Sequence, residues 1–496
     1  MRAITVLVVV AASAAHASPN VALEDPVYDE LARLRATGRL AAYVGGFRPL
    51  TAARVERLLA AAGEPVDDPI PEGWWVGPID QWAVRASLVG EHARSYSTSI
   101  RPRDLIGAIA LSCDHHQGRP CGDGAGIATE LDASAGYGTW VSAAVRMRAH
   151  TGTADYADGI ELDRGYATAE LGPAAIELGR DVVVLGPAAH THHGWGDNAP
   201  PLDHVRVATA RPFPLNRWLR GTIVYVLGRL RDPQTFSGNL VSIARGQLDI
   251  ADRVELGMHQ ELQVRGDGAP QLGVWGFVLE HFARSDPSAT ATDSSNRRVG
   301  FDIAARLGTA RLYYTLVFED WRKHFIDAVH YDADHVLGIE LAALGRNALV
   351  VEVARTGVRS YEHSPRRTGL TNAGRIAGDP LGPDTQSVFV GGRIAFGDRA
   401  VQPWLQLARL SSDTYDLVPY GPIHRVTTGV AELRLRTGAK LRIPLTRELR
   451  VEPEVVFERV GSAGFDPTAR RNNVGVTATV SWQPRVRRAS RTADSP

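Results

Sequence analysis

Long segments in which apolar and polar residues alternate are the feature that most constrains the fold of this chain. In residues 309–320, TARLYYTLVFED, Leu312 and Leu316 share one face, while Arg311 and Thr315 lie on the other. Strict alternation predicts β-strands with one apolar and one polar face. Such segments run about 9 to 11 residues here, the length of a tilted membrane-spanning strand, whereas strands of water-soluble proteins more often have about 5 or 6.

The same pattern occupies residues 431–445, AELRLRTGAKLRIPL, in which Leu433 is apolar and Arg434 is charged. We expect a hairpin here that turns at Thr437-Gly438. Two architectures produce such alternation: a soluble sheet with its apolar face on a core, and a membrane barrel with its apolar face toward lipid and its charges inside. The length of the strands favours the membrane barrel.

Residues 76–482 are therefore predicted to form an all-β transmembrane antiparallel barrel. At roughly 21 residues for each strand and its connection, the chain from residue 95 to residue 482 provides about 18 strands, with 16 as the alternative even number. Beyond the N-terminus, no apolar run approaches the roughly 18 residues of a transmembrane helix, so a spanning chain must close into a barrel. Tryptophans near predicted strand ends are typical of interfacial girdles: Trp218, Trp275, Trp321, Trp404 and Trp482.

The two ends of the chain are predicted to lie outside the barrel. The sequence opens MRAITVLVVVAASAAHAS, with a basic residue, a short apolar run and a small-x-small cleavage site. Residues 1–17 are thus predicted to be a secretory signal, with an anchoring helix as the alternative. Residues 483–496 are rich in arginine and are predicted to be a disordered basic tail in the periplasm.

Residues 18–75 are predicted to be a small α-helical segment in the periplasm. One helix is expected after Asp25-Pro26, ending at Gly38, and a second after Thr51, ending at Gly63. Capping residues at the start and glycine at the end are typical helix boundaries. Three prolines near residue 70 then separate this segment from the barrel.

Two cysteines, Cys113 and Cys121, lie in the stretch SCDHHQGRPC. In an exported protein this spacing favours a disulfide that closes a short loop. The alternative is a metal site that also uses His115 and His116. Basic and acidic residues balance at 55 each, so the charge gives no reason to expect a nucleic-acid partner.

Several short motifs, in their order along the chain, resemble the capsule assembly Wzi family of outer-membrane barrels. The residues that carry the resemblance are Leu185-Gly186-Pro187 through Asp197 to Asp203, Val254 to Gly257, Gly300-Phe301-Asp302, Glu319-Asp320, Gly338-Ile339-Glu340, Glu352 with Thr356, Tyr361 with His363, and Gly374 to Gly378. Leu185 departs from the pattern, because the family usually has tryptophan there. The C-terminal sequence RVRRASRTADSP is a second departure, since many such barrels end on an aromatic residue.

The resemblance implies a barrel in the cell outer membrane that binds capsular or exopolysaccharide at the cell surface and assists capsule assembly. It implies no enzymatic activity and no cofactor. The expected partners are the polysaccharide, outer-membrane lipid and the capsule export machinery.

The stretch 185–203, LGPAAHTHHGWGDNAPPLD, is the first candidate site and is expected to lie outside the cell. An aromatic plane can carry a sugar ring, and histidine, aspartate and asparagine can bond its hydroxyls. The candidate polysaccharide-binding residues are His190, His192, Trp195, Asp197 and Asn198. The alternative is a catalytic metal site that adds His193 and His204, but one extended strand cannot direct three successive histidines to one side.

The stretch YEHSPRRTGLTNAGRIAG, residues 361–378, is the second candidate. Arginine presents a planar fork that matches a carboxylate of an acidic polysaccharide. The candidate residues are Tyr361, His363, Arg366 and Arg375. The alternative is that these are ordinary solvated loop charges.

Two other function classes remain open at this point. One is a porin or a conduit for polysaccharide, although paired charges on the interior face would disfavour a strongly ion-selective pore. The other is a secreted metal-dependent hydrolase. Stable open conductance would support the first, and stoichiometric bound metal the second.

Overall fold

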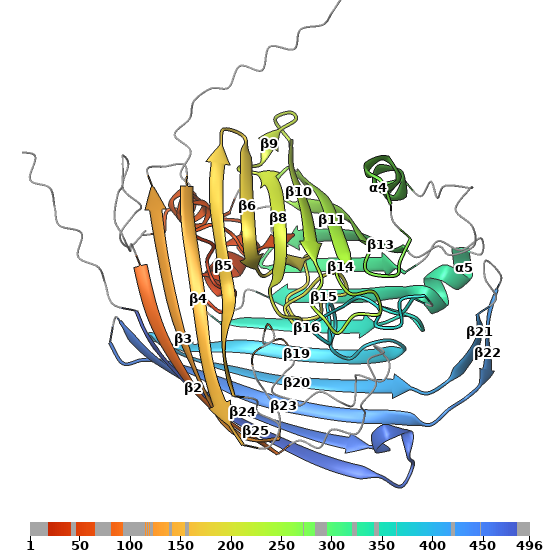
Figure 1. The fold of residues 1–496 in the computed structure, drawn as a ribbon. Helices are drawn as coiled ribbons and strands as arrows, with labels where there is room; N and C mark the ends of the chain where they lie inside the picture. Colours follow the sequence, from red (N-terminus) through yellow and green to blue (C-terminus); the bar gives the residue numbers. More distant parts are fainter. Residues whose placement is uncertain are drawn as a thin grey trace, which may run out of the picture.

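A closed antiparallel barrel dominates the computed structural model, which describes residues 18–40, 46–64, 81–92, 115, 117, 119, 123–137, 141–153, 158–270, 272–282, 295–319, 325–341, 347–363, 365–417, 422–446 and 448–483 (Figure 1). The barrel has nineteen labelled segments in this part of the chain, and β8 and β9 both pair with β10 as one interrupted strand. The count is therefore eighteen strands, which confirms the predicted number. The strands are β2 Gln81–His92, β3 Gly124–Tyr137, β4 Val141–Gly152, β5 Gly159–Leu171, β6 Ala174–Asp181, β8 Leu202–Thr209 with β9 Phe213–Pro214, β10 Leu219–Arg229, β11 Leu240–Ile250, β12 Val254–Val264, β13 Asn296–Leu307, β14 Ala310–Phe318, β15 Ala333–Leu341, β16 Ala348–Arg355, β19 Thr385–Phe396, β20 Arg399–Ser411, β23 Ala431–Pro444, β24 Leu449–Gly461 and β25 Arg470–Trp482.

Neighbouring strands pair in chain order, and the last strand pairs with the first. β2 pairs with both β3 and β25, with Val84 opposite Trp482. Closure leaves no strand edge unpaired, which a barrel in lipid requires. No helix among the described residues combines the length and the apolar composition needed to cross a lipid bilayer.

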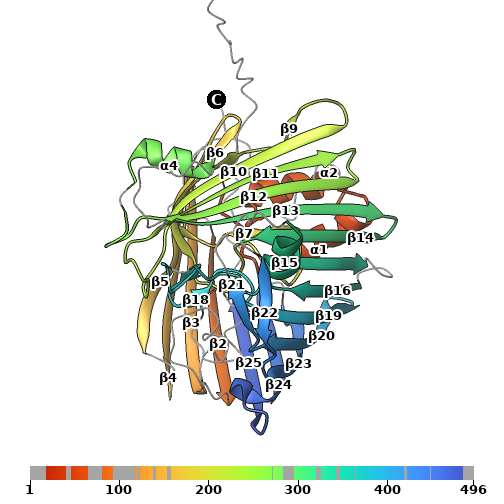
Figure 2. The same ribbon diagram turned by 90° about the vertical axis from the view of Figure 1, so that its right-hand side faces the viewer.

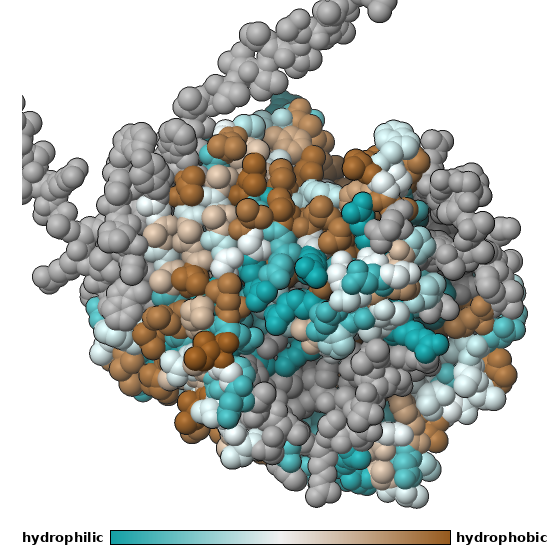
Figure 3. Space-filling view, viewed as in Figure 1, coloured by the Kyte–Doolittle hydropathy of each residue, from teal (hydrophilic) through white to brown (hydrophobic). Residues whose placement is uncertain are grey.

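The alternating pattern places apolar side chains on the outside of the barrel and charged side chains inside. Leu337 and Leu433 are more than half exposed, at 57% and 56%, whereas Arg311 and Arg434 are buried. Figure 3 shows the apolar side chains gathered over the strands of the wall. This arrangement is inside out relative to a soluble protein and is typical of a membrane barrel.

The predicted hairpin at Thr437-Gly438 is wrong, because β23 runs without a turn through both residues. Gly438 lies opposite Trp404 of β20, and a Cβ at this position would lie 2.7 Å from two atoms of the indole ring. The glycine therefore makes room for a tryptophan and does not make a turn. Trp404 itself lines a cavity inside the barrel, so it is not part of an interfacial girdle.

Two helices near the N-terminus confirm the predicted helical segment. α1 Val27–Ala36 ends before Gly38, and α2 Ala52–Ala61 begins after Thr51, whose side chain accepts a hydrogen bond from the N–H of Arg54. The helices are not free of the barrel. Arg35 lies 3.4 Å from Glu340 of β15, and Asp29 of α1 lies 3.0 Å from Arg442 of β23. Figure 2 shows both helices within the outline of the strands.

The barrel has two distinct ends. Short turns such as 308–309 and 397–398 mark one end, which we call the short-turn end and where α1 lies. Connections such as 182–201, 356–384 and 412–430 mark the other, the long-loop end. This end also carries α4 Val274–His281, α5 Phe325–Asp327, η2 Ala328–Asp332, and the hairpin of β21 Thr414–Leu417 with β22 Ile423–Thr427, which extends past the wall (Figure 1). The predicted signal, the disulfide of Cys113 and Cys121, Trp321 and all of the tail but Gln483 lie outside the described residues.

Candidate functional site

Two long connections fold back into the barrel and meet inside it. We call residues 182–201, 356–363 and 365–384 the plug. The N–H of Gly196 donates to the carbonyl of Ala377 at 2.7 Å, and the Asn198 side chain donates to the carbonyl of Ile376 at 2.8 Å. The Tyr361 hydroxyl donates to the carbonyl of His193 at 3.2 Å. The two segments therefore form one unit.

Close packing of the plug depends on glycine. A Cβ on Gly378 would lie 2.5 Å from the Tyr361 hydroxyl and 2.8 Å from the carbonyl oxygen of Gly194. Trp195 and Tyr361 are 1% and 0% exposed, and they belong to one apolar cluster with Val226 of β10. The plug thus occupies the lumen and is packed as a protein interior is packed.

The wall holds the plug mainly through carboxylates that accept backbone N–H groups. Glu352 of β16 accepts the N–H groups of Ala189, His190 and Thr191 at 2.9, 3.0 and 2.7 Å. Glu261 of β12 accepts the N–H of Trp195 at 2.6 Å. These contacts satisfy buried polar groups of a non-repetitive segment, which would otherwise be costly to bury.

Arg298 of β13 is the centre of this network. Its guanidinium lies 3.0 Å from Glu261, 2.7 Å from Glu319 and 2.7 Å from Asp334. It also donates to the carbonyl of His193 at 2.9 Å and lies 4.4 Å from the centre of the Tyr361 ring. One buried side chain therefore joins β12, β13, β15 and the residue that follows β14 to both segments of the plug.

The structure brings the two predicted sites together, but inside the lumen. Five of the nine candidate residues are buried: His192, Trp195, Asn198, Tyr361 and Arg366. The other four are partly buried: His190, Asp197, His363 and Arg375. The stretch 185–203, which was expected to lie outside the cell, is instead drawn into the barrel by backbone hydrogen bonds and apolar packing.

The buried members of the two sites have protein partners. Arg366 donates hydrogen bonds to Asn239 and to the carbonyl of Arg265, and its guanidinium lies over the ring of Phe236. Trp195 packs in the apolar cluster of the plug. In this conformation their role is to hold the plug together.

The histidines of the first site point to different partners. His192 lies 3.3 Å from Arg48, His193 contacts the carbonyl of His335 at 3.1 Å, and His204 lies 2.9 Å from Glu177. Within the described ranges, no group of three or more histidine, cysteine, aspartate or glutamate side chains could hold a metal ion. The geometry therefore offers no support for the hydrolase alternative.

A cavity of about 410 Å³ lies between α1, the plug and strands β15, β16, β19 and β20. Three of the candidate residues, His190, His192 and Asp197, line this cavity. The ring of His190 stacks on Phe389 with centroids 3.7 Å apart, and Phe389 stacks in turn on Trp404 at 6.4 Å. These candidates therefore face an internal space near the short-turn end.

Burial changes the protonation of the cavity side chains. It lowers the pKa of His192 to about 3, with Arg48 adding to the shift and Asp197 opposing it, and it lowers the pKa of His190 well below its usual value. For Asp197, burial alone would raise the pKa. His115, at 2.9 Å, together with His192 and Arg48 outweighs that effect and holds the pKa well below its usual value. His190 and His192 are thus neutral at physiological pH.

Acidification is expected to loosen the plug. The ordinary pKa of histidine is 6.5, so a released plug gains protons below that pH while the seated plug gains none until about pH 3. Between pH 7 and pH 5, the low pKa of His192 alone should lower the free energy of releasing the plug by on the order of 2 kcal/mol. The lowered pKa of Asp197 stabilises the seated plug above about pH 4, and this contribution is lost only when the pH falls below that value.

Hydrogen exchange of peptides from residues 185–203 measures this effect. Exchange, corrected for its intrinsic pH dependence, should rise between pH 7 and pH 5 in the wild type and less in His192→Gln. Equal pH profiles for the two proteins would contradict the assignment to His192.

A further group of polar and aromatic residues lies at the long-loop end, and we call it the mouth cluster: Tyr331, Asp384, Asp413, Tyr415 and Arg425. The rings of Tyr331 and Tyr415 meet edge to face with centroids 6.0 Å apart. The Tyr415 hydroxyl lies 3.4 Å from Asp384, and Arg425 lies 3.3 Å from Asp413 with its side chain 53% exposed. Burial and the neighbouring Asp384 raise the pKa of Tyr415 to about 12, so this hydroxyl remains a donor.

Sequence reasoning missed the mouth cluster because its members come from three separate connections. One local signal was available. Tyr331 and Tyr415 each precede an aspartate in a connection between two predicted strands, in the stretches HYDAD and DTYD. Tyrosine beside a carboxylate in a loop is a combination that suits sugar hydroxyls.

Among solved structures, the Escherichia coli outer-membrane protein Wzi, described as involved in group 1 capsule assembly and as a carbohydrate-binding β-barrel, is similar to this chain. The two share 15% sequence identity, with a TM-score of 0.67 and coverage of 94% of this chain and 99% of that protein. Two Pseudomonas aeruginosa proteins are also similar, at lower TM-scores. OccD3 (OpdP) shares 11% sequence identity with a TM-score of 0.48, and the match covers 87% of this chain and 98% of that protein. OprD shares 8% sequence identity with a TM-score of 0.48, and the match covers 84% of this chain and 94% of that protein.

No match was found among curated protein sequences. The sequence model of the family described as capsule assembly protein Wzi matches residues 111–474. This match spans well over half of the 496 residues. The chain therefore belongs to the capsule assembly Wzi family.

Proposed function

We propose that this protein is an outer-membrane β-barrel that binds capsular or exopolysaccharide at the cell surface and assists capsule attachment, without catalysing a reaction. Membership of the Wzi family supports this proposal, as does the likeness of its fold to a barrel described as carbohydrate-binding. The exposed apolar face of the wall supports placement in a membrane. Export through the predicted signal at residues 1–17 is part of the proposal.

The plug favours a binding protein over a channel, because it fills the lumen. A barrel of 16 to 18 strands leaves an aqueous channel when its lumen is free. Here buried residues of both plug segments occupy the lumen, and carboxylates of the wall hold them. A surface binder needs no open lumen, whereas a porin or a conduit does.

The proposed orientation places the long-loop end outside the cell. Barrels of the outer membrane have short periplasmic turns and longer extracellular loops. The helices α1 and α2 then face the periplasm, at the short-turn end. The mouth cluster faces the extracellular side.

We place the glycan contacts at the mouth cluster. The aromatic surfaces of Tyr331 and Tyr415 suit the apolar face of a pyranose, and Asp384 suits its hydroxyls. Arg425 is half exposed and can pair with a carboxylate of an acidic polysaccharide. Among the residues predicted from the sequence, His363 is partly exposed on the plug and is proposed as a separate contact.

Binding of polysaccharide purified from the producing strain tests this proposal. The double variant Tyr415→Ala/Arg425→Gln should bind about tenfold more weakly, because loss of one tyrosine or arginine at the centre of an interface typically costs more than 1 kcal/mol. Cells that carry it should release polysaccharide into the medium.

Arg470→Gln is the matched control for this variant. Arg470 is an exposed arginine at the start of β25, at the same end, and it donates to the carbonyls of Pro467 and Ala469. This variant should bind as the wild type does. Full retention of polysaccharide by a strain that lacks the whole protein would overturn the proposed function.

A further inference from the structure

Three arginines face outward from alternate strands at the long-loop end of the barrel. Arg355 belongs to β16, Arg409 to β20 and Arg459 to β24. Arg355 lies directly opposite Gln386 of β19, and Gln386 lies directly opposite Arg409. Since neighbouring strands are about 4.8 Å apart, Arg355 and Arg409 start from backbone positions about 10 Å apart.

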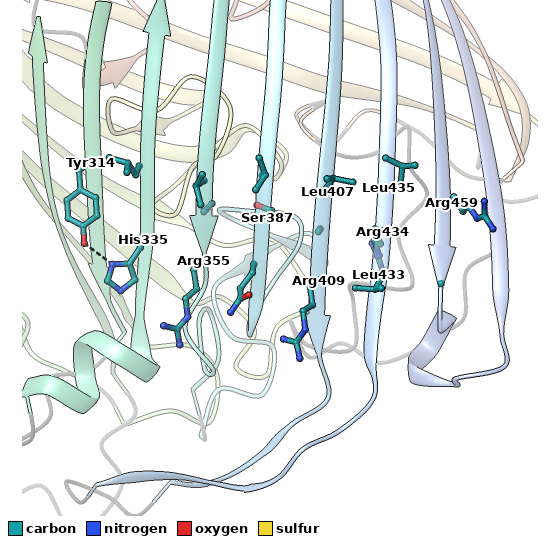
Figure 4. A pocket seen from close by; sticks show the side chains of 17 residues that line it. Tyr314, His335, Arg355, Ser387, Leu407, Arg409, Leu433, Arg434, Leu435 and Arg459 are labelled. Atoms are coloured by element: carbon teal, nitrogen blue, oxygen red, sulfur yellow. Dashed lines mark hydrogen bonds between the residues drawn. The ribbon is translucent and has the colours of Figure 1, made fainter. Parts of the chain in front are cut away.

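Arg355 and Arg409 lie at the boundary of the apolar band, and Arg459 lies one outward position deeper, opposite Leu435 of β23. The outward residue two positions nearer the middle of each strand is apolar and exposed: Val353 on β16, Leu407 on β20 and Phe457 on β24. Figure 4 shows Arg355 and Arg409 side by side, with their guanidinium groups directed toward the long-loop end and Leu407 and Leu435 on the other side. Arg355 and Arg409 therefore sit where the headgroups of the outer leaflet meet the acyl chains.

The three arginines have no carboxylate partner within the part of the chain that the structure describes. Two outward arginines elsewhere on the rim do have one. Arg180 lies 2.5 Å from Asp203, and Arg297 lies 2.8 Å from Glu280. Within the described residues, the barrel therefore pairs these two arginines with carboxylates and leaves the three arginines of this sector without one.

The arginines also border a hollow in the outer surface. A groove of about 850 Å³ runs across strands β14 to β24, and its lining includes all three arginines and no aspartate or glutamate. A neighbouring hollow beside Arg355 is lined by Phe325 and Ile326 of α5, and Ile326 is 80% exposed. The groove thus combines apolar walls with cationic groups at one end, as an amphipathic phospholipid or glycolipid requires.

We propose that this groove binds the phosphorylated headgroup of an outer-leaflet glycolipid, the lipid A portion of lipopolysaccharide. The acyl chains lie against Leu407 and its apolar neighbours, and Arg355 and Arg409 bind phosphate. A separation of about 10 Å between the two arginines suits a disaccharide that carries one phosphate at each end. Gln386, between them, supplies an amide for the sugar.

The inference rests on the proposed outer-membrane orientation but not on polysaccharide binding. Arginine binds phosphate through paired hydrogen bonds and charge. Basic residues at a membrane surface attract anionic headgroups in the same way. The bound lipid would fix the height and tilt of this sector of the wall, next to the hairpin that carries Tyr415.

Native mass spectrometry of the whole protein in detergent, with bisphosphorylated lipid A added and no polysaccharide present, tests the proposal. The wild type should retain lipid A. The variant Arg355→Gln/Arg409→Gln/Arg459→Gln should bind it at least tenfold more weakly. Lipid A from which both phosphates have been removed should bind the wild type as weakly as the phosphorylated lipid binds the triple variant.

The matched control is Arg180→Gln/Arg229→Gln/Arg297→Gln, which removes the same charge from outward positions in other sectors. This control should bind lipid A as the wild type does. Equal binding by both triple variants would overturn the proposal, and so would effective competition by inorganic phosphate, which would indicate a site for free anions.

Electrophoresis without boiling shows whether each variant still forms the barrel. If the triple variant does not fold, Arg409→Gln alone should still weaken binding severalfold. Loss of lipid binding with polysaccharide binding intact, or the reverse, separates this inference from the proposed function.

Discussion

Replacing residues 183–200 and 358–382 with short glycine-serine linkers should turn a silent barrel into a conducting one. The plug fills the lumen of an eighteen-stranded barrel, and such a barrel without a plug leaves an aqueous channel. In planar bilayers we expect no stable open state for the wild type. For the variant we expect discrete conductance steps at least tenfold above the leak.

The hairpin of β21 and β22 provides the control for the plug deletion. Replacing residues 414–427 with a linker shortens a connection of the same end but leaves the plug in place, so this variant should remain silent. It should also lose polysaccharide binding, since it lacks Tyr415 and Arg425. Stable conductance in the wild type would favour the conduit alternative.

The helices at the short-turn end set how large the opened channel can be. α1 lies within the barrel through contacts such as Arg35 with Glu340, so it narrows the path after the plug is gone. Removal of residues 18–64 in addition to the plug should raise the conductance further. If the lumen stayed closed in both variants, the plug could not be the main barrier.

The architecture could be predicted from the sequence because it depends on a local pattern. Apolar and polar residues alternate within single strands, as in residues 309–320, so each strand can be recognised from its own sequence. The error at Gly438 shows the limit of that reasoning. The apolar positions on both sides of Gly438 stay in phase, as one continuous strand requires. Whether the chain turns at this glycine or runs on and makes room for Trp404 depends on the neighbouring strand.

The location of the plug could not be predicted in the same way. A loop lies inside or outside a barrel according to the partners that the wall provides, and those partners are far away in the sequence. Glu352 accepts the N–H groups of residues 189–191 from more than 160 positions away. One local signal was present, since the stretch 185–203 carries only Asp197 and Asp203 as fully charged side chains, which is few for an exposed loop.

The family motifs acquire a physical meaning in the structure. Glu319, Glu340 and Glu352 all face the lumen, where they hold Arg298, Arg311 and the plug backbone. Gly338 lies opposite Tyr313, and a Cβ there would lie 2.3 Å from the tyrosine ring. These residues of the family motifs therefore build the plugged interior.

Arg298→Leu should have the largest effect on stability of any single substitution in this network. It would leave three buried carboxylates, Glu261, Glu319 and Asp334, without their shared cation. Removing one partner of a buried ion pair typically costs about 3–5 kcal/mol. All three carboxylates also accept plug N–H groups, those of Trp195, Tyr361 and Gly357, so the plug should loosen together with the wall.

Electrophoresis after heating to graded temperatures measures the change, because a closed barrel and an unfolded chain migrate differently. The folded form of Arg298→Leu should be lost at a markedly lower temperature than that of the wild type. Arg297→Leu, at the preceding residue, removes a pair with one carboxylate, Glu280, which keeps a hydrogen bond from Ser295. It should shift the transition less, because one carboxylate loses its cation instead of three. The second-site change Glu319→Gln should restore part of the stability of Arg298→Leu, because it removes one of the stranded charges. A wild-type transition in Arg298→Leu would show that the plug is held by packing alone and that the charged network is dispensable.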